Sequence, residues 1–250
     1  LIFLDEIQSD PKWALTLKML FERTTNVFFC CSGSAAVVLQ TDSNLARRAI
    51  FERLSPLSFS EYEMTKNNVK PPQDLSKNIM KNLYFSKNAE LAYKGLLSLK
   101  SKVNQYWTKA NYSNYKNYLA YGSLPFSFNL PNETAIYDSI QLLLDKVIKS
   151  DLPILGSFDN DTLGVIKRLL FTIAENDTTS LVKLEEVFKL SRHTIASIFE
   201  SLEKAEILIK IPAYGSNMSV AKKSNKYLFA APALRMSFFY FTGIESTYNS

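Results

Sequence analysis

The sequence has few of the residues from which common catalytic centres are built. His193 is the only histidine, which gives no basis for a catalytic triad or for a His-based metal site. Cys30 and Cys31 are the only cysteines, and they are neighbours inside an apolar run. Adjacent residues of a strand face opposite sides, so the two thiols are poor partners for a disulfide or a metal. We expect buried thiols in a reducing compartment.

Long apolar runs are also absent. No stretch approaches the ~20 apolar residues of a membrane span, and no signal peptide is visible. We therefore expect a cytoplasmic protein with no membrane partner. The 46% hydrophobic and 21% charged fractions are those of an ordinary globular chain. The net charge of +5 permits contact with nucleic acid without requiring it.

A phosphate-binding loop is missing as well. Such a loop needs Gly, four residues, Gly, Lys and Ser or Thr, and none of the seven glycines is followed by Lys. Yet the chain opens with four apolar residues and then Asp5 and Glu6. This is the pattern of a Walker B strand, which delivers one acid to Mg²⁺ and one to the attacking water of a nucleoside triphosphatase. We expect a P-loop ATPase that lacks its N-terminal part.

Residues 1–34 predict a strand, a helix and a second strand. Apolar residues recur at helical spacing from Trp13 to Phe21, and 27–31 is a continuous apolar run typical of a strand covered on both faces. A right-handed crossover makes the two strands parallel. Asp5-Glu6 and Ser32-Gly33-Ser34 then fall at the carboxyl ends, the edge where open α/β sheets bind ligands.

The middle of the chain is predicted to be largely helical. Residues 48–54 suggest one more short strand, and Ser58 and Glu61 have the spacing of a capping box that starts a helix. Residues 66–78 are polar and contain Pro71-Pro72, which indicates a linker or a surface loop. Helical patterns follow over 75–119 and 137–148, separated by a break at 121–125.

The last part predicts a separate unit. Three short helices are expected, the third capped by Ser191, and two candidate strands follow at 207–211 and 226–230. Three helices and a hairpin make a winged helix-turn-helix. The predicted fold class is α/β, with three domains. They are the C-terminal part of a parallel-sheet P-loop ATPase domain at 1–65, a helical lid or linker region at 66–158, and a winged-helix domain at 159–250.

Several short patterns carry a family resemblance. They are Leu-Asp-Glu-Ile-Gln at 4–8, Ser-Gly-Ser-Ala at 32–35, and Leu-Ser-Pro-Leu-Ser-Phe-Ser-Glu-Tyr at 54–62. Gly-Ser-Leu-Pro at 122–125 and Lys-Ser-Asp-Leu at 149–152 are weaker matches. Together they resemble the bacterial and archaeal AAA-type P-loop ATPases that carry a C-terminal domain of unassigned function containing a winged helix. Arg47-Arg48 stand where that family has Gly-Arg, so only Arg48 matches.

The resemblance implies roles for five residues. Asp5 would hold ATP-bound Mg²⁺, and Glu6 would polarise the attacking water. Ser32 or Ser34 would be the sensor that touches the γ-phosphate or the water. Arg48 would act on the phosphates of a neighbouring subunit as an arginine finger, which implies a homo-oligomer; the alternative is a surface arginine. The intact parent would be an ATPase with ATP and Mg²⁺ as cofactors, and this chain alone would be inactive.

The sequence leaves the partner of the winged-helix domain open. Double-stranded DNA would be contacted through the first turn of the third helix and the wing, with Lys and Arg binding phosphates. Three glutamates on the third helix dilute its charge, so docking to a protein is an equal alternative. The competing functions are a nucleotide-driven switch, a DNA-binding regulator with little ATP turnover, and a protein-interaction scaffold. The candidate DNA contacts are Arg192, His193, Thr194, Lys222, Lys223 and Lys226.

Overall fold

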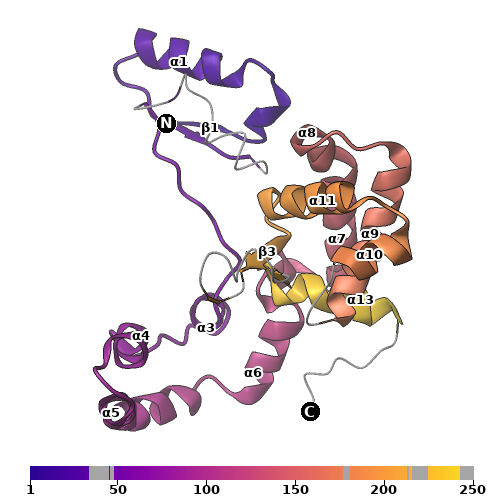
Figure 1. The fold of residues 1–250 in the computed structure, drawn as a ribbon. Helices are drawn as coiled ribbons and strands as arrows, with labels where there is room; N and C mark the ends of the chain where they lie inside the picture. The colour runs from indigo at the N-terminus through magenta and orange to yellow at the C-terminus, as the bar shows by residue number, and fades with distance from the viewer. Residues whose placement is uncertain (34–44, 46–47, 177–180, 213, 216–224, 243–250) are drawn as a thin grey trace. The chain divides into compact units, whose positions relative to one another are not determined.

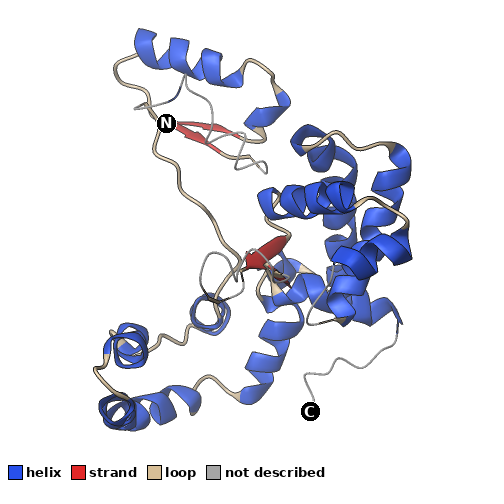
Figure 2. Ribbon diagram, in the orientation of Figure 1, coloured by secondary structure: helices blue, strands red, loops and turns tan. Residues whose placement is uncertain are grey.

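The structure is a computed structural model that describes residues 1–33, 45, 48–176, 181–212, 214–215 and 225–242. Most of these residues are helical, and the strands form two separate two-stranded sheets (Figures 1 and 2). The chain divides into two compact units. Unit 1 comprises Leu1–Ser55 with Ser139–Ala230, and unit 2 comprises Pro56–Asp138 with Ala231–Ser250. The three domains expected from the sequence stay a prediction.

Unit 1 opens with the strand–helix–strand segment. Strand β1 (Ile2–Leu4), the 3-10 turn η1 (Ile7–Ser9), helix α1 (Trp13–Arg23) and strand β2 (Phe29–Cys31) follow one another. The two strands pair in parallel, with Leu4 opposite Cys31, which confirms the predicted parallel pairing. No larger parallel sheet is formed by the described residues.

The strand predicted at 48–54 is wrong. Residues 49–58 carry no regular secondary structure, and Ile50 and Leu54 are exposed. A strand requires a neighbour that takes its backbone hydrogen bonds, and no strand of the described residues pairs with this segment. Residues 27–31 were also predicted to form a strand covered on both faces. This is wrong for the described residues, because Val27, Phe28 and Cys30 are exposed.

The rest of unit 1 holds a compact helical core. Its elements in order are η5 (Val147–Asp151), α8 (Leu152–Leu155), α9 (Asn160–Glu175), α10 (Leu181–Phe188), α11 (Arg192–Lys204), β3 (Leu208–Ile211) and β4 (Lys226–Phe229). Asp159 and Ser191 cap α9 and α11 by accepting backbone N–H bonds. Strands β3 and β4 are antiparallel. The apolar residues at helical spacing in α9 and α11 are buried, as the sequence predicts.

Unit 2 is built around an aromatic cluster. Its elements are α3 (Phe59–Asn67), α4 (Leu75–Phe85), α5 (Ala89–Trp107), α6 (Tyr112–Asn117), η3 (Tyr118–Gly122), η4 (Pro125–Asn129) and α13 (Pro232–Thr242). Helix α7 (Glu133–Lys146) runs from unit 2 into unit 1. Phe59 on α3 stacks on Trp107 with ring centroids 5.6 Å apart, and its edge meets Tyr115 and Tyr118.

Two local features fix α3 in this cluster. The side chain of Ser58 accepts the backbone N–H of Glu61, and the Glu61 carboxylate accepts the backbone N–H of Ser58. This is the predicted capping box, and it is confirmed. Tyr62 lies directly over Gly122, where an added Cβ would come within 2.4 Å of the ring. Only glycine leaves room for the ring at this position.

Candidate active site

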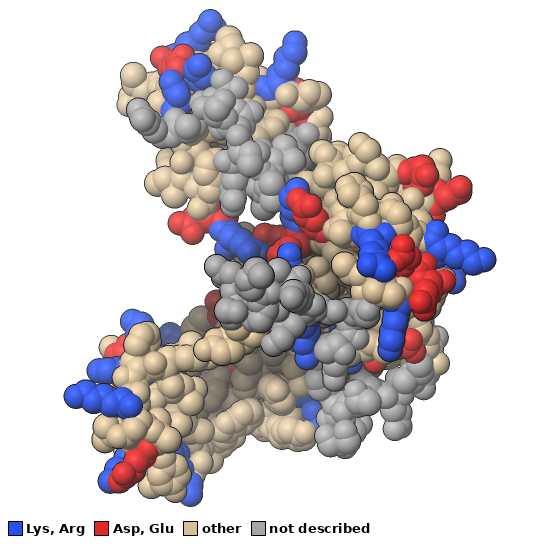
Figure 3. All heavy atoms as spheres, in the orientation of Figure 1, with Lys and Arg blue, Asp and Glu red and all other residues tan. Residues whose placement is uncertain are grey.

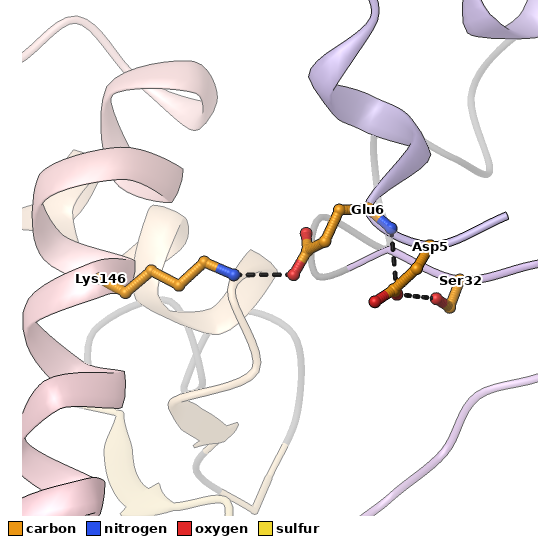
Figure 4. A network of polar contacts seen from close by, with 4 residues as sticks. All are labelled: Asp5, Glu6, Ser32 and Lys146. Carbon is orange, nitrogen blue, oxygen red and sulfur yellow. Dashed lines mark hydrogen bonds and ion pairs between the residues drawn. The ribbon is translucent and has the colours of Figure 1, made fainter.

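The candidate site begins where β1 and β2 end. Asp5 follows β1 and Ser32 follows β2, and the backbone N–H of Ser32 donates to the carbonyl of Leu4 at 2.8 Å. The Ser32 hydroxyl donates to Oδ1 of Asp5, and the backbone N–H of Glu6 donates to the same oxygen at 3.0 Å (Figure 4). Parallel pairing therefore brings the two polar sequence signatures into direct contact.

Glu6 has an unusual backbone conformation. Its φ and ψ are 50° and 45°, in the left-handed region, which costs a residue with a Cβ roughly 1 kcal/mol or more. This turn carries the chain from β1 into η1. The Glu6 carboxylate then meets the ammonium of Lys146, with Oε1 and Nζ 2.7 Å apart (Figure 4).

Lys146 is a site residue that the sequence did not predict. It is the last residue of α7, and 140 positions separate it from Glu6. The hydrogen bond to Glu6 is the main cause that raises the pKa of Lys146; burial opposes it, and the charges of Glu6, Asp151 and Asp5 each add a smaller increase. Lys146 is therefore held as a cation by the Glu6 carboxylate. No local pattern distinguishes this lysine from the chain's other surface lysines.

The remaining predicted ATPase residues are Ser34 and Arg48. Arg48 pairs with Glu22 of α1, with Nη2 and Oε1 2.9 Å apart. Its guanidinium is therefore engaged with a carboxylate of unit 1. Ser34 and Arg47 lie outside the described residues. Within the described ranges, no three His, Cys, Asp or Glu side chains form a group that could hold a metal ion by themselves.

Three of the six candidate DNA contacts lie at the start of α11. Arg192 and His193 are exposed, and Arg192 pairs with Glu185 of α10 at 2.7 Å. The backbone N–H of Thr194 donates a hydrogen bond to the capping hydroxyl of Ser191 at 3.1 Å. Lys226 begins β4, whereas Lys222 and Lys223 lie outside the described residues. Half of the predicted DNA-binding set is thus placed at one helix end.

Comparison with known proteins places the chain in a class and in a family. Residues 1–63 match the AAA domain, a nucleotide-binding fold. Residues 112–247 match the family described as a domain of unknown function (DUF8612). This second match covers more than half of the chain, and the chain belongs to that family.

The chain is also similar to one curated archaeal protein. Uncharacterized protein MJ1637 of Methanocaldococcus jannaschii is 29% identical over 246 residues, which is 98% of this chain and 49% of that protein. The chain thus spans about half the length of this relative. No solved structure matches the 250-residue chain. Among the described residues, no helix has both the length and the apolarity that crossing a bilayer requires.

Proposed function

We propose that this chain belongs to an ATP-driven switch, in which an AAA-type nucleotide site acts on a winged-helix domain. The observation that carries the proposal is the contact between Asp5 and Ser32 at the carboxyl ends of two adjacent parallel strands. That edge is where parallel α/β sheets bind nucleotides. The AAA match over residues 1–63 supports it independently.

The side chains at this edge fit Mg²⁺ and ATP. Magnesium prefers oxygen ligands and is commonly held by one or two carboxylates together with substrate phosphates. Asp5 supplies a carboxylate and Ser32 a hydroxyl, which are donors of the required type. Mg²⁺ would neutralise charge on the phosphates. Asp5 would bind and orient the ion, Ser32 would hold Asp5 in place, and Glu6 would accept a hydrogen bond from the attacking water.

The site needs a phosphate-binding loop from outside residues 1–250. The sequence contains no Gly-x4-Gly-Lys pattern, and backbone amides of such a loop normally hold the β- and γ-phosphates. The apolar side chains of Phe3 in β1 and of Phe28, which directly precedes β2, are exposed, as expected where further chain covers the sheet. The relative of twice the length agrees with this proposal. The 250-residue chain alone should bind ATP weakly and hydrolyse none.

Two substitutions test the site in a protein that includes the phosphate-binding loop. Glu6→Gln should leave ATP bound and reduce hydrolysis by at least about a hundredfold, because the carboxylate that orients water is lost. Asp5→Asn should also weaken Mg²⁺-dependent binding. ATP binding and phosphate release measure the two effects separately. If both variants hydrolyse ATP at the parental rate, the Walker B assignment is wrong.

Lys146 gives the proposed site a connection to the C-terminal family region. While Lys146 holds Glu6, Oε1 of the carboxylate is engaged by a cation and the side chain is kept in this orientation. We therefore assign Lys146 as a positioning residue that restrains Glu6 in the absence of nucleotide. In the loop-containing protein, Lys146→Met should raise basal hydrolysis severalfold. It should also move the acidic limb of the pH–rate profile to higher pH, because Glu6 loses the cation that favours its charged form. Unchanged basal turnover and pH profile would assign the ion pair to structure alone.

A second candidate function is duplex DNA binding by a winged helix comprising α9, α10, α11, β3 and β4. The exposed first turn of α11, with Arg192 and His193, favours it, since this turn enters the major groove in such domains. Replacing Lys222 and Lys223 by Ala should weaken binding about equally for all sequences and lower the salt slope by about 2. Absence of duplex binding at low salt would leave protein docking as the role of this domain.

A further inference from the structure

Residues 75–107, which form helices α4 and α5 and the turn between them, have a net charge equal to that of the whole chain. Residues 75–107 contain six lysines and one acidic residue, Glu90, while the rest of the chain has 23 basic and 23 acidic residues. Residues 159–250, the region of the proposed winged helix, have 11 basic and 10 acidic residues. The charge excess that a polyanion or an anionic surface would attract therefore lies on the α4–α5 pair. The six lysines are Lys77, Lys81, Lys87, Lys94, Lys100 and Lys102.

Most of these lysines are not used in ion pairs. Lys94 pairs with Glu90 at 2.7 Å, and Lys77 lies 3.7 Å from Asp74. The other four have no carboxylate within ion-pair distance among the described residues. In Figure 3 lysine side chains stand out around the part of the molecule formed by α4 and α5.

The same two helices expose large apolar side chains near the turn that joins them. Phe85 is 81% exposed and Tyr84 is 70% exposed. Water around apolar side chains of this size is unfavourable, and a cluster of them beside a turn marks an interaction site more often than isolated ones do. The exposed apolar side chains at this end are Leu83, Tyr84, Phe85, Leu91, Tyr93 and Leu97.

The packing of the pair leaves this end available. Helices α4 and α5 pack chiefly on each other, with Asn82 of α4 against Gly95 of α5. The opposite end of α5 is anchored in unit 2, because Trp107 stacks on Phe59 and meets Tyr115 edge to face. Since Trp107 is 16 residues beyond Leu91 on the same helix, the anchored end and the exposed end are separated by about 24 Å of helix.

We infer that the end of the α4–α5 pair formed by residues 81–97 docks on an anionic lipid surface. Peripheral membrane helices combine lysines with exposed Leu, Phe, Tyr and Trp side chains, which enter the headgroup region while the lysines meet lipid phosphates. Such docking needs no helix that spans the bilayer. It revises the expectation of no membrane partner, which rested on the lack of a spanning segment.

Two other occupants fit the surface less well. A second copy of the chain would bring lysines against lysines, which opposes association. Nucleic acid would use the lysines and stack on Tyr84 or Phe85, but it offers no apolar partner to Leu83, Leu91 and Leu97. Lipid satisfies both kinds of side chain.

Co-sedimentation of the 250-residue chain with vesicles tests the inference. Vesicles of phosphatidylcholine with phosphatidylglycerol should bind the chain, and phosphatidylcholine alone should bind it much less. Replacing Lys81, Lys87 and Lys94 by Gln should weaken binding on the order of a hundredfold, at about fivefold for each lysine. Replacing Tyr84 and Phe85 by Ser should weaken it at least about tenfold, including at high salt, where charge contributes least.

Matched controls come from unit 1. Leu142 is 70% exposed and Val187 is also exposed, so changing both to Ser removes two exposed apolar side chains elsewhere. Changing the exposed Lys12, Lys183 and Lys189 to Gln removes the same charge. Both control variants should keep vesicle binding within about twofold.

Equal loss in test and control variants, or no binding to anionic vesicles, overturns the inference. Binding that is insensitive to the Tyr84 and Phe85 changes and is displaced by duplex DNA overturns it in favour of nucleic acid.

Discussion

In residues 1–33 no side chain of either strand is fully buried, whereas the apolar stripes of α9 and α11 are buried. Phe3 is 72% exposed, but Leu169 is completely buried. Both segments have apolar patterns of the kind that form a core. The difference lies in their neighbours, because three helices and a strand pair can cover one another, while a two-stranded sheet with one helix leaves a face open. A self-sufficient core and an incomplete one therefore coexist in unit 1.

The largest expected effect comes from substitutions in these two segments. Leu169→Ala should lower the free energy of unfolding by about 2–5 kcal/mol, since it leaves a cavity in a closed core. Phe3→Ala should lower it by less than about 0.5 kcal/mol, because the side chain is largely in water already. Urea titration of both variants measures the contrast. Equal losses would mean that the Phe3 side chain is covered in solution.

An intermediate effect is expected on the stability of unit 2 at alkaline pH. Burial, with smaller contributions from Tyr121 and Glu63, raises the pKa of Tyr62 to about 12 from its usual 10.0. Because the folded-state pKa is the higher one, this contribution to stability is complete below pH 10 and is lost as pH rises toward about 12. Melting temperatures across this range should fall less for Tyr62→Phe than for the parent chain. Identical pH profiles would contradict the assignment to Tyr62.

The smallest expected effect compares two helix caps. Ser58→Ala removes a reciprocal capping box from α3, and Ser191→Ala removes a single cap bond from α11. Each should cost about 1 kcal/mol, with Ser58 the more costly because the Glu61 carboxylate also loses a partner. Unfolding free energies of the two variants decide the order. A larger loss for Ser191→Ala would indicate that the cap matters less than the core behind it.

Local sequence signals predicted the parts of the fold that depend on local physics. The Ser58 capping box, the Ser191 cap and the parallel pairing of the first two strands are confirmed. Helix α13 was not predicted, although Pro232 at its first position is a known start signal. Its nearly continuous apolar composition lacks the periodicity that distinguishes a helix from a strand.

The candidate site was predictable only where strand topology dictates it. Asp5 and Ser32 follow from two parallel strands, so their meeting at one sheet edge could be expected. The partners of Glu6 and Arg48 could not, because Lys146 and Glu22 reach them through tertiary packing. The roles of Asp5, Glu6, Ser34 and Arg48 in catalysis stay predictions.

The adjacent cysteines of β2 give the chain a chemical reporter of its own. Cys30 is exposed and Cys31 is partly buried, and burial followed by the charge of Cys30 raises the pKa of the Cys31 thiol. Thiolates are the reactive form, so an alkylating reagent should modify Cys30 first. Neighbouring strand residues face opposite sides of the sheet, and each thiol therefore reports on one face. Slower alkylation of Cys30 in a longer protein would identify the face that additional chain covers, without any mutation.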